Sequence, residues 1–258
     1  MASPVEPPVP LPSQLPATAH AFAERLDDRV TLEGDDGHHL QRARRVRDGE
    51  TITVADGYGR WRAYVVERAT RGEVDLRATT LVAHEPRLTP RLTVACSLTK
   101  GTRPELAVQK LTELGVDRIM LVRAARSVVQ WDDAKIAAAS TRLARVAREA
   151  AMQSRRARIP VVDGPVTPAE LAPLAGLVVA APEGVTAVAL PEPTGGEWNV
   201  AVGPEGGFDD DELRAFGAAP RLAAGPFVLR AETAAIAVAA GLAGRRTVSP
   251  DLDDRREW

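Results

Sequence analysis

The stretch that decides the fold runs from Trp198 to Gly244 and reads WNVAVGPEGGFDDDELRAFGAAPRLAAGPFVLRAETAAIAVAAGLAG. Its apolar run from Asn199 to Val202 has the composition of a short buried strand. The run leads into Gly203–Gly207, where three glycines surround one proline and one glutamate. Such a segment forms no regular element and lets the backbone lie directly against a ligand. The pattern therefore predicts a buried strand that ends in a glycine-rich turn.

A second strand and turn follow in the same stretch. Asp209 or Asp210 is expected to cap a helix, and the apolar piece Leu222–Ala224 then reaches the turn at Gly225-Pro226. A helix of small residues, Ala234–Gly241, closes the stretch, and small residues allow close packing against another backbone. Two glycine–proline turns after two strands indicate either a ligand pocket or two ordinary tight turns.

Length and composition limit the classes of protein that fit. The 258 residues suffice for one large domain or two small ones, and the net charge of −2 creates no overall basic field. Cys96 is the only cysteine, which excludes disulfides within the chain and cysteine-rich metal sites, and we expect no metal. No apolar run is long enough to span a bilayer, and the N-terminus lacks a signal-peptide pattern. The cytoplasm is the expected location, with no membrane partner.

The chain divides into three parts by composition and by the pattern of predicted strands and helices. Residues 1–16 are rich in proline and predict a disordered segment. Residues 17–85 show short strands with tight turns, including a hairpin signal at Asp56-Gly57, and predict a small β-barrel. After a linker at 84–90, residues 91–248 alternate strands and helices, which predicts a largely parallel sheet covered on both faces.

Local signals set the helix boundaries in the last part. Pro104 suits the first turn of a helix that stops before Gly115. Asp132 or Asp133 is expected to start a long helix that ends near Ser154. The charged tail after Arg245 is expected to fray.

The glycine-rich stretch carries a family resemblance. Val202–Leu213 and Gly225–Ala234 resemble the two signature stretches of the RsmE family, which are SPOUT-superfamily methyltransferases acting on the N3 of a uridine in 16S ribosomal RNA. Further matches occur in order along the chain: His38–Leu40, Arg44–Val46 and Asp48–Glu50, then Lys100-Gly101, Gln109-Lys110, Thr112–Val116 and Arg126–Val128, then Glu149–Ser154 and Arg158–Pro160.

The resemblance implies a fold, a cofactor and partners. The fold is α/β, a SPOUT-type parallel sheet over 91–248 with a C-terminal trefoil knot, preceded by a PUA-like RNA-binding β-barrel over 17–85. S-adenosylmethionine is expected in the knot loops of a homodimer. The expected activity is methylation of a uridine N3 in 16S ribosomal RNA of the small subunit.

The two glycine-rich turns provide the expected cofactor site, largely through backbone groups. The candidate cofactor-binding residues are Gly203, Pro204, Glu205, Gly206, Leu222, Gly225, Pro226, Val228, Leu229 and Thr233.

The candidate catalytic residues are Arg230, Glu205 and Glu232. Removal of the N3 proton calls for a base, and a side-chain base in these loops would have to be a carboxylate; water is the alternative acceptor. Arg230 either holds a substrate group or pairs with Glu232 on the surface. Glu205 either faces the sulfonium or ribose or caps the following helix.

Arginines in two clusters are candidates for phosphate contacts, with a solvated surface as the alternative. The candidate RNA-binding residues are Arg42, Arg44, Arg45, Arg47, Arg155 and Arg156.

One departure from the family pattern is Phe227, which stands where the family usually carries arginine. Two other functions therefore stay open: a SPOUT methyltransferase acting on another RNA such as tRNA, and an inactive ribosome-associated RNA-binding protein.

Overall fold

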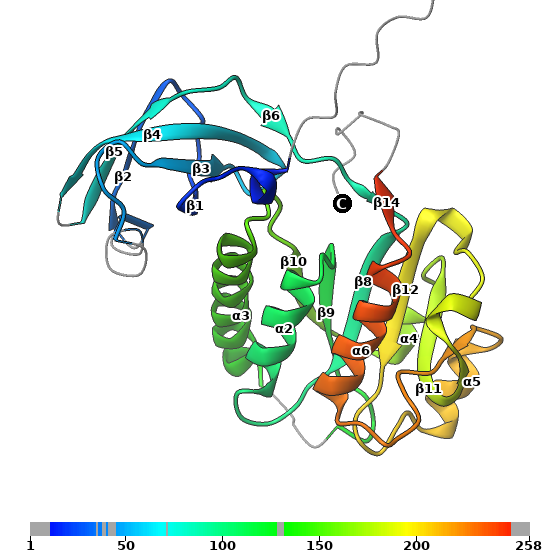
Figure 1. Cartoon of the computed structure of the whole chain (residues 1–258). Coiled ribbons are helices and arrows are strands. Elements are labelled where there is room, and N and C mark those ends of the chain that lie inside the picture. The colour runs from blue at the N-terminus through cyan, green and yellow to red at the C-terminus, as the bar shows by residue number, and fades with distance from the viewer. Residues whose placement is uncertain are drawn as a thin grey trace, which may run out of the picture. The chain divides into compact units, whose positions relative to one another are not determined.

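A computed structural model describes residues 11–34, 36–37, 40, 45–70, 72–127 and 132–248. These residues form two compact units (Figure 1). The first unit comprises the chain up to residue 86 together with residues 151–159, and the second comprises residues 87–150 and the chain from residue 160 onward.

The first unit is a small β-structure, as the short strands and tight turns predict. Its sheet has the order β1-β3-β4-β5-β2, with β6 paired to β4. The β1–β3 pair is parallel and the other pairs are antiparallel. Alternate residues such as Ile52, Tyr64 and Leu76 fill its core. The strands are β1 Ala19–Phe22, β2 Arg29–Leu32, β3 Thr51–Ala55, β4 Arg60–Thr70, β5 Glu73–Ala78 and β6 Ala83–His84.

Residues 151–159 pack with the first unit, although the sequence places them inside the methyltransferase part. Met152 and Ala157 lie in one apolar cluster with Phe22 and Trp61. The guanidinium of Arg155 donates to the carbonyl oxygens of Leu15 at 3.1 Å and Ala17 at 2.6 Å. The proline content predicts disorder over residues 1–16, but residues 11–16 include the short helix η1 Pro12–Gln14, and residues 1–10 lie outside the described residues.

The second unit is built on a parallel sheet. Its strand order is β10-β9-β8-β12-β11-β13, and every pair in it is parallel. The strands are β8 Arg91–Ser97, β9 Arg118–Val122, β10 Val161–Val166, β11 Leu177–Val185, β12 Glu197–Val202 and β13 Arg221–Leu222. The predicted parallel sheet is therefore confirmed.

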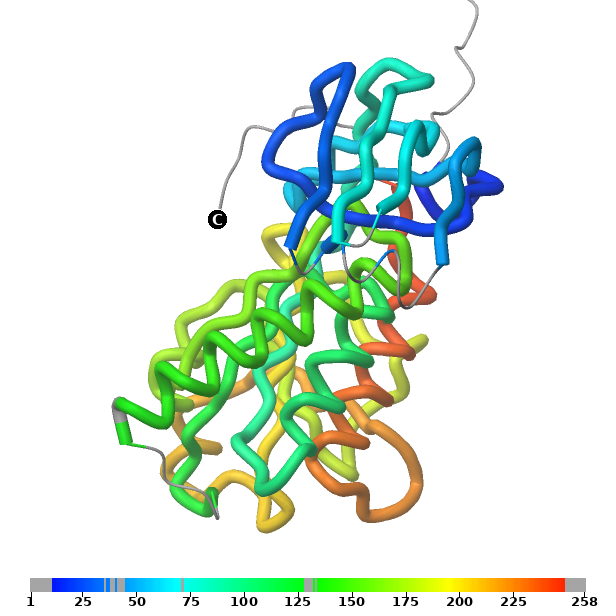
Figure 2. The backbone as a smooth tube through the Cα atoms, turned by 90° about the vertical axis from the view of Figure 1, so that its left-hand side faces the viewer, coloured from blue at the N-terminus to red at the C-terminus, as the bar shows by residue number. Residues whose placement is uncertain are grey.

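Helices cover both faces of this sheet. Helices α2 Arg103–Glu113 and α6 Ala231–Ala243 pack on each other over β8 and β12, side by side in both Figure 1 and Figure 2. Helices α4 Pro168–Leu171 and α5 Asp210–Phe216 pack together on the other face, and η2 Ala187–Ala189 contacts α6. The remaining elements are α3 Asp133–Ser154 and η3 Thr194–Gly196.

The predicted helix boundaries are largely confirmed. Helix α2 begins at Arg103 with Pro104 in its first turn, and Gly115 follows its end with a φ of +83°. Helix α3 begins at Asp133 and ends at Ser154. The spacing of three between Leu40, Ala43 and Val46 predicts a helical segment over residues 37–47, and more than half of that segment lies outside the described residues.

The expected linker and the expected frayed tail meet in a small antiparallel pair. Strand β7 Leu88–Thr89 pairs with β14 Thr247–Val248. The side chain of Arg246 is completely buried there, pairs with Asp117, and donates to the carbonyl oxygens of Pro90 and Gly115. Burial lowers the pKa of this guanidinium from its usual value. The chain is therefore held in place as far as Val248, three residues into the tail that is expected to fray.

The strand order also shows where a ligand is expected. From β8 the sheet grows outward through β9 to β10, and in the opposite direction through β12 to β11 and β13. Such a reversal of order leaves a crevice at the carboxyl ends of the strands, which is the usual ligand position in parallel sheets. The trefoil knot that the resemblance implies stays a prediction.

Candidate active site

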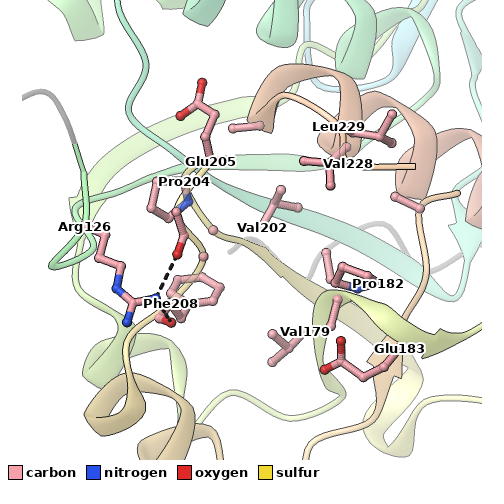
Figure 3. Close-up of a pocket in the computed structure, with 18 of the residues that line it drawn as sticks. Arg126, Val179, Pro182, Glu183, Val202, Pro204, Glu205, Phe208, Val228 and Leu229 are labelled. Atoms are coloured by element: carbon pink, nitrogen blue, oxygen red, sulfur yellow. Dashed lines mark hydrogen bonds between the residues drawn. The ribbon is translucent and has the colours of Figure 1, made fainter. Parts of the chain in front are cut away.

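A cavity of about 390 Å³ opens at the carboxyl ends of β11 and β12, within the size range of small-molecule sites. Figure 3 shows its walls, which come from segments far apart in the sequence. The lining residues include Val179–Glu183, Val202–Phe208, Ala224-Gly225, Phe227–Leu229 and Arg126.

The first wall is the glycine-rich turn after β12. Gly207 has a φ of +70°, which favours glycine, and its N–H donates to the carbonyl of Pro204 at 2.8 Å. Asp209 then caps α5: its Oδ1 accepts from the N–H of Glu212 at 2.8 Å, and Glu212 Oε2 accepts from the N–H of Asp209 at 2.8 Å. The predicted cap is confirmed at Asp209 and not at Glu205, which leaves Glu205 available to the cavity.

The loop after β9 supports this wall from behind. Arg126 Nη1 donates to the carbonyl oxygens of Gly206 at 2.8 Å and Phe208 at 3.3 Å, shown as dashed lines in Figure 3. The N–H of Ala125 donates to Glu212 Oε1 at 2.7 Å. Glu212 thus joins the cap of α5 to the β9 loop, and these contacts hold the glycine-rich turn in place.

The second wall is the turn at Gly225 and the residues that lead into α6. Neither Gly206 nor Gly225 adopts a positive φ. A Cβ placed on Gly225 would meet only Leu229 Cδ1, at 3.9 Å, and one on Gly206 would meet Arg126 Cδ at 3.5 Å. Neither backbone conformation nor packing demands glycine at these two positions, so open access to the cavity is the better explanation.

A third wall comes from β11, through Pro182 and Glu183. The pairing of β11 with β13 shifts between Ala180 and Val185, which is a bulge beside the cavity. Gly184 permits it, because a Cβ there would lie 2.5 Å from the backbone nitrogen of Leu222. Glu183 is exposed and lies across the cavity from Glu205 in Figure 3.

One arginine connects two of the predicted catalytic carboxylates. Arg103 Nη1 donates to Glu205 Oε1 at 3.2 Å, and Arg103 Nε lies 3.6 Å from Glu232 Oε1. The Glu205 side chain is 40% exposed and lines the cavity, whereas the Glu232 side chain is 7% exposed. The two carboxylates therefore differ in access to a substrate.

Cys96, on β8 beside Val202 of β12, is fully buried. Burial raises the pKa of its thiol to about 12. The thiol is thus neutral at physiological pH and cannot act as a thiolate nucleophile.

Comparison with known proteins places this chain in a family. Residues 86–243 match the model of an RNA methyltransferase domain, and residues 32–79 match that of an RNA methyltransferase PUA domain. The ribosomal RNA small subunit methyltransferase E of Mycobacterium bovis is 41% identical over 227 residues, which cover 83% of this chain and 86% of the relative. The chain belongs to the ribosomal RNA small subunit methyltransferase E family.

A further relative and two solved structures match most of this chain, and the solved structures share its fold. The methyltransferase E of Bacillus subtilis is 27% identical, over 79% of this chain and 85% of its own. A putative methyltransferase from Legionella pneumophila, solved with S-adenosylmethionine, superposes with a TM-score of 0.76 at 28% identity, covering 89% of this chain and 98% of its own. The Neisseria gonorrhoeae methyltransferase E shares the fold, with a TM-score of 0.77 at 24% identity over 88% and 97%.

The structure brings most of the predicted cofactor residues to the cavity. Seven line it: Gly203, Pro204, Glu205, Gly206, Gly225, Val228 and Leu229. Leu222 is buried, and Pro226 and Thr233 are exposed outside the lining. Arg230 is exposed at the N-cap of α6, and the surface pair with Glu232 does not form, because Glu232 is buried against Arg103.

The predicted RNA-binding arginines fall into three groups. Arg42 and Arg44 lie outside the described residues. Arg45 and Arg47 are exposed on the first unit, as a phosphate contact requires. Arg155 uses its guanidinium to hold Leu15 and Ala17, which favours a structural role, and the carbonyl of the neighbouring Arg156 faces His20 Nε2 at 3.1 Å.

Sequence reasoning missed two charged residues of this family member's site, Glu183 and Arg103, and it considered Arg126 only as a weaker candidate for RNA contact. A signal for Glu183 exists, since Pro182-Glu183-Gly184 near the end of β11 repeats the Pro204-Glu205-Gly206 pattern that follows β12. The two arginines carry no local signal, because their partners lie 80 and 102 residues away.

The described residues also bear on two other classes of site. They contain no group of three or more side chains suited to hold a metal ion. None of the helices they form is long and apolar enough to cross a membrane.

Proposed function

We propose that this chain methylates the N3 of a uridine in 16S ribosomal RNA, with the small ribosomal subunit as its substrate. Membership of the methyltransferase E family supplies the coarser statement, S-adenosylmethionine-dependent methylation of ribosomal RNA. The observation that carries the proposal is the cavity between the two glycine-rich turns, at the carboxyl ends of the parallel strands. N3 lies on the base-pairing edge, so the target must be unpaired or turned out of its helix.

The residues of the cavity fit S-adenosylmethionine. The volume suits a ligand of that size, and Gly206 and Gly225 leave space that neither packing nor conformation requires. The apolar side chains of Val179, Val202 and Leu229 suit an adenine ring, and Glu183 offers an acceptor for ribose hydroxyls.

When bound, S-adenosylmethionine would supply the methyl group for N3, with the electron pair of the broken carbon–sulfur bond left on sulfur. The N3 proton must leave before or during methyl transfer, because the electron pair of the neutral imide nitrogen is delocalised, and it therefore needs an acceptor. Glu205 suits this role better than Glu232, because Glu205 lines the cavity and Glu232 does not. The N3 proton passes to the Glu205 carboxylate, and exposed Arg230 holds the RNA substrate by a phosphate or by the target base.

We further propose a homodimer. Phe227 is 79% and Val228 is 90% exposed, side by side at the rim of the cavity. Exposed apolar neighbours favour burial against a partner, and the occupant we propose is a second copy of this chain. Light scattering of the purified chain should give twice the monomer mass. The small-subunit substrate also leads us to propose a cytoplasmic location.

Labelled methyl transfer tests the function. The chain is incubated with S-adenosylmethionine carrying a labelled methyl group and with small subunits, naked 16S RNA or tRNA from a strain that lacks the gene. We expect label in the small subunits, recovered as 3-methyluridine after digestion. Label recovered in tRNA instead would favour another RNA as the substrate. Cofactor binding without any transfer would favour a binding-only protein, in which Phe227 marks lost catalysis.

A further inference from the structure

Glu232 is a buried carboxylate near the active site that does not line the cavity. It is the second residue of α6, and its Oε2 is shielded from solvent with no hydrogen-bond partner among the described residues. A buried carboxylate is costly unless an opposite charge compensates it. Arg103 supplies that charge at 3.6 Å, and the N-terminus of α6 adds a favourable dipole.

Arg103 also contacts the carboxylate that does line the cavity. Its Nη1 donates to Glu205 Oε1 at 3.2 Å, while its Nε faces Glu232. One guanidinium thereby joins the start of α2, the glycine-rich turn after β12 and the start of α6. A planar guanidinium presents several donors in fixed directions, whereas a lysine ammonium would be a single point charge.

Glu205 and Glu232 differ in exposure, so only one of the two carboxylates that Arg103 joins can reach a substrate. Glu232 is nearly inaccessible, so it is not placed to touch a substrate. Arg103 is 38% exposed but lies outside the cavity lining, and its guanidinium faces the two carboxylates. Glu205 is 40% exposed, and Arg103 contacts only its Oε1. The buried end serves as an anchor, and the exposed end carries the group available for chemistry.

We propose that Arg103 is a positioning residue that holds Glu205 at the cavity, with Glu232 as its buried anchor. The inference rests on the proposed function, in which Glu205 takes the N3 proton. Arg103 acts by fixing the direction of the Glu205 carboxylate, since proton transfer requires the acceptor within hydrogen-bond reach.

A purely structural role makes a different prediction. Arg103 lies on α2, which packs directly against α6. If it only tied these helices together, its loss would affect stability and cofactor affinity, and its effect on turnover would be independent of Glu205.

A double-mutant cycle on turnover separates the two roles. Turnover is measured as total label transferred to small subunits at saturating cofactor, for Arg103→Ala, Glu205→Gln and the double variant. We expect each single variant to lose about a hundredfold in kcat, and the double variant to lose no more than Glu205→Gln alone. The Kd for S-adenosylmethionine, measured by calorimetry, should change by less than about threefold.

Three further variants are measured in the same way. Arg103→Lys keeps the charge opposite Glu232 and should restore part of kcat, and it serves as the folded variant if Arg103→Ala does not fold. Glu232→Gln should lower kcat by a smaller factor, and only when Glu205 is present. Arg142→Ala is the matched control. Arg142, on α3, pairs through Nε at 2.8 Å with Glu105, which lies on α2 as Arg103 does. The kcat of this variant should equal that of the wild type.

Losses that multiply in the double variant would overturn the inference and leave the proposed function intact, since the wild type would still transfer label. Equal kcat for Arg103→Lys and wild type would also overturn it, because a point charge would then suffice. No transfer by the wild type on any RNA would overturn the proposed function and this inference together.

Discussion

At the scale of single residues, two glycines distinguish a ligand site from an ordinary turn. Gly207 needs its positive φ and Gly184 needs the absence of a Cβ, so both are explained by the fold. Gly206 and Gly225 meet neither requirement, and both line the cavity. Their lack of a side chain is thus best explained by the ligand.

Gly225→Val should weaken S-adenosylmethionine binding by about tenfold or more, because the branched side chain takes up cavity space. Gly244→Val is the matched control, since Gly244 lies outside the cavity with nothing within 4 Å of an added Cβ. Calorimetry on both folded variants measures the effect. Wild-type affinity in Gly225→Val would contradict the placement of the cofactor.

Arg230 should matter to turnover more than to cofactor affinity. It is exposed and does not line the cavity. Arg230→Ala is expected to lower kcat by about a hundredfold and to leave the cofactor Kd nearly unchanged, because its contact is made to the RNA substrate or the transition state. Steady-state kinetics on small subunits and calorimetry test this pair of results; a weakened Kd at unchanged kcat would assign Arg230 to the cofactor instead.

At the scale of elements, the sequence predicts those features whose causes are local. Pro104 and Gly115 bound α2, and Asp209 with Glu212 caps α5, because each signal and its effect lie within a few residues. The same reasoning does not predict the contacts of Arg103 and Arg126, because their partners lie in the turn after β12 and, for Arg103, also on α6. It also misses the bulge in β11, because the pairing of β11 with β13 sets that register.

Glu212 is the element-level contact that holds the cofactor turn in place. Glu212→Ala removes acceptors from the N–H groups of Asp209 and Ala125 and should lower stability by about 1–2 kcal/mol. It should also weaken cofactor binding severalfold, because the turn must then be ordered on binding. Asp211→Ala is the control, as Asp211 pairs only locally with Arg214. Equal cofactor affinity in both variants would show that the turn is rigid without Glu212.

At the scale of the whole molecule, composition and the pattern of strand and helix signals predict a small β unit and a parallel α/β unit, both of which the structure contains. They do not predict that residues 151–159 join the first unit, or that Arg246 is buried. In both cases the cause is a contact between distant segments: Arg155 with Leu15 and Ala17, and Arg246 with Asp117. Such contacts leave no periodic pattern in the sequence.

Another contact between distant segments, that of His20 with Arg156, makes stability depend on pH. His20 is buried in the first unit, and its Nε2–H donates to the carbonyl of Arg156 at 3.1 Å while Nδ1 lies 2.7 Å from Thr53 Oγ1. Burial lowers its pKa from 6.5 to about 4. Because the unfolded chain then binds the proton more readily, stability is full above pH 6.5 and falls as the pH drops toward 4.

The expected loss from His20 is about 2 kcal/mol between pH 7 and pH 5. Urea unfolding of the wild type and of His20→Gln at both pH values measures it. The variant should be less stable at pH 7 but should lose less stability on acidification. The same loss in both proteins would mean that His20 does not titrate during unfolding.

The central claim is that this chain, through this cavity, forms 3-methyluridine in 16S ribosomal RNA. Its most direct test is nucleoside mass spectrometry of 16S RNA from a strain that lacks the gene and carries either the wild-type chain or Gly225→Val. The prediction is that 3-methyluridine is absent without the gene, returns with the wild type and stays absent with Gly225→Val. Its presence in the strain without the gene, or full restoration by Gly225→Val, would contradict the claim.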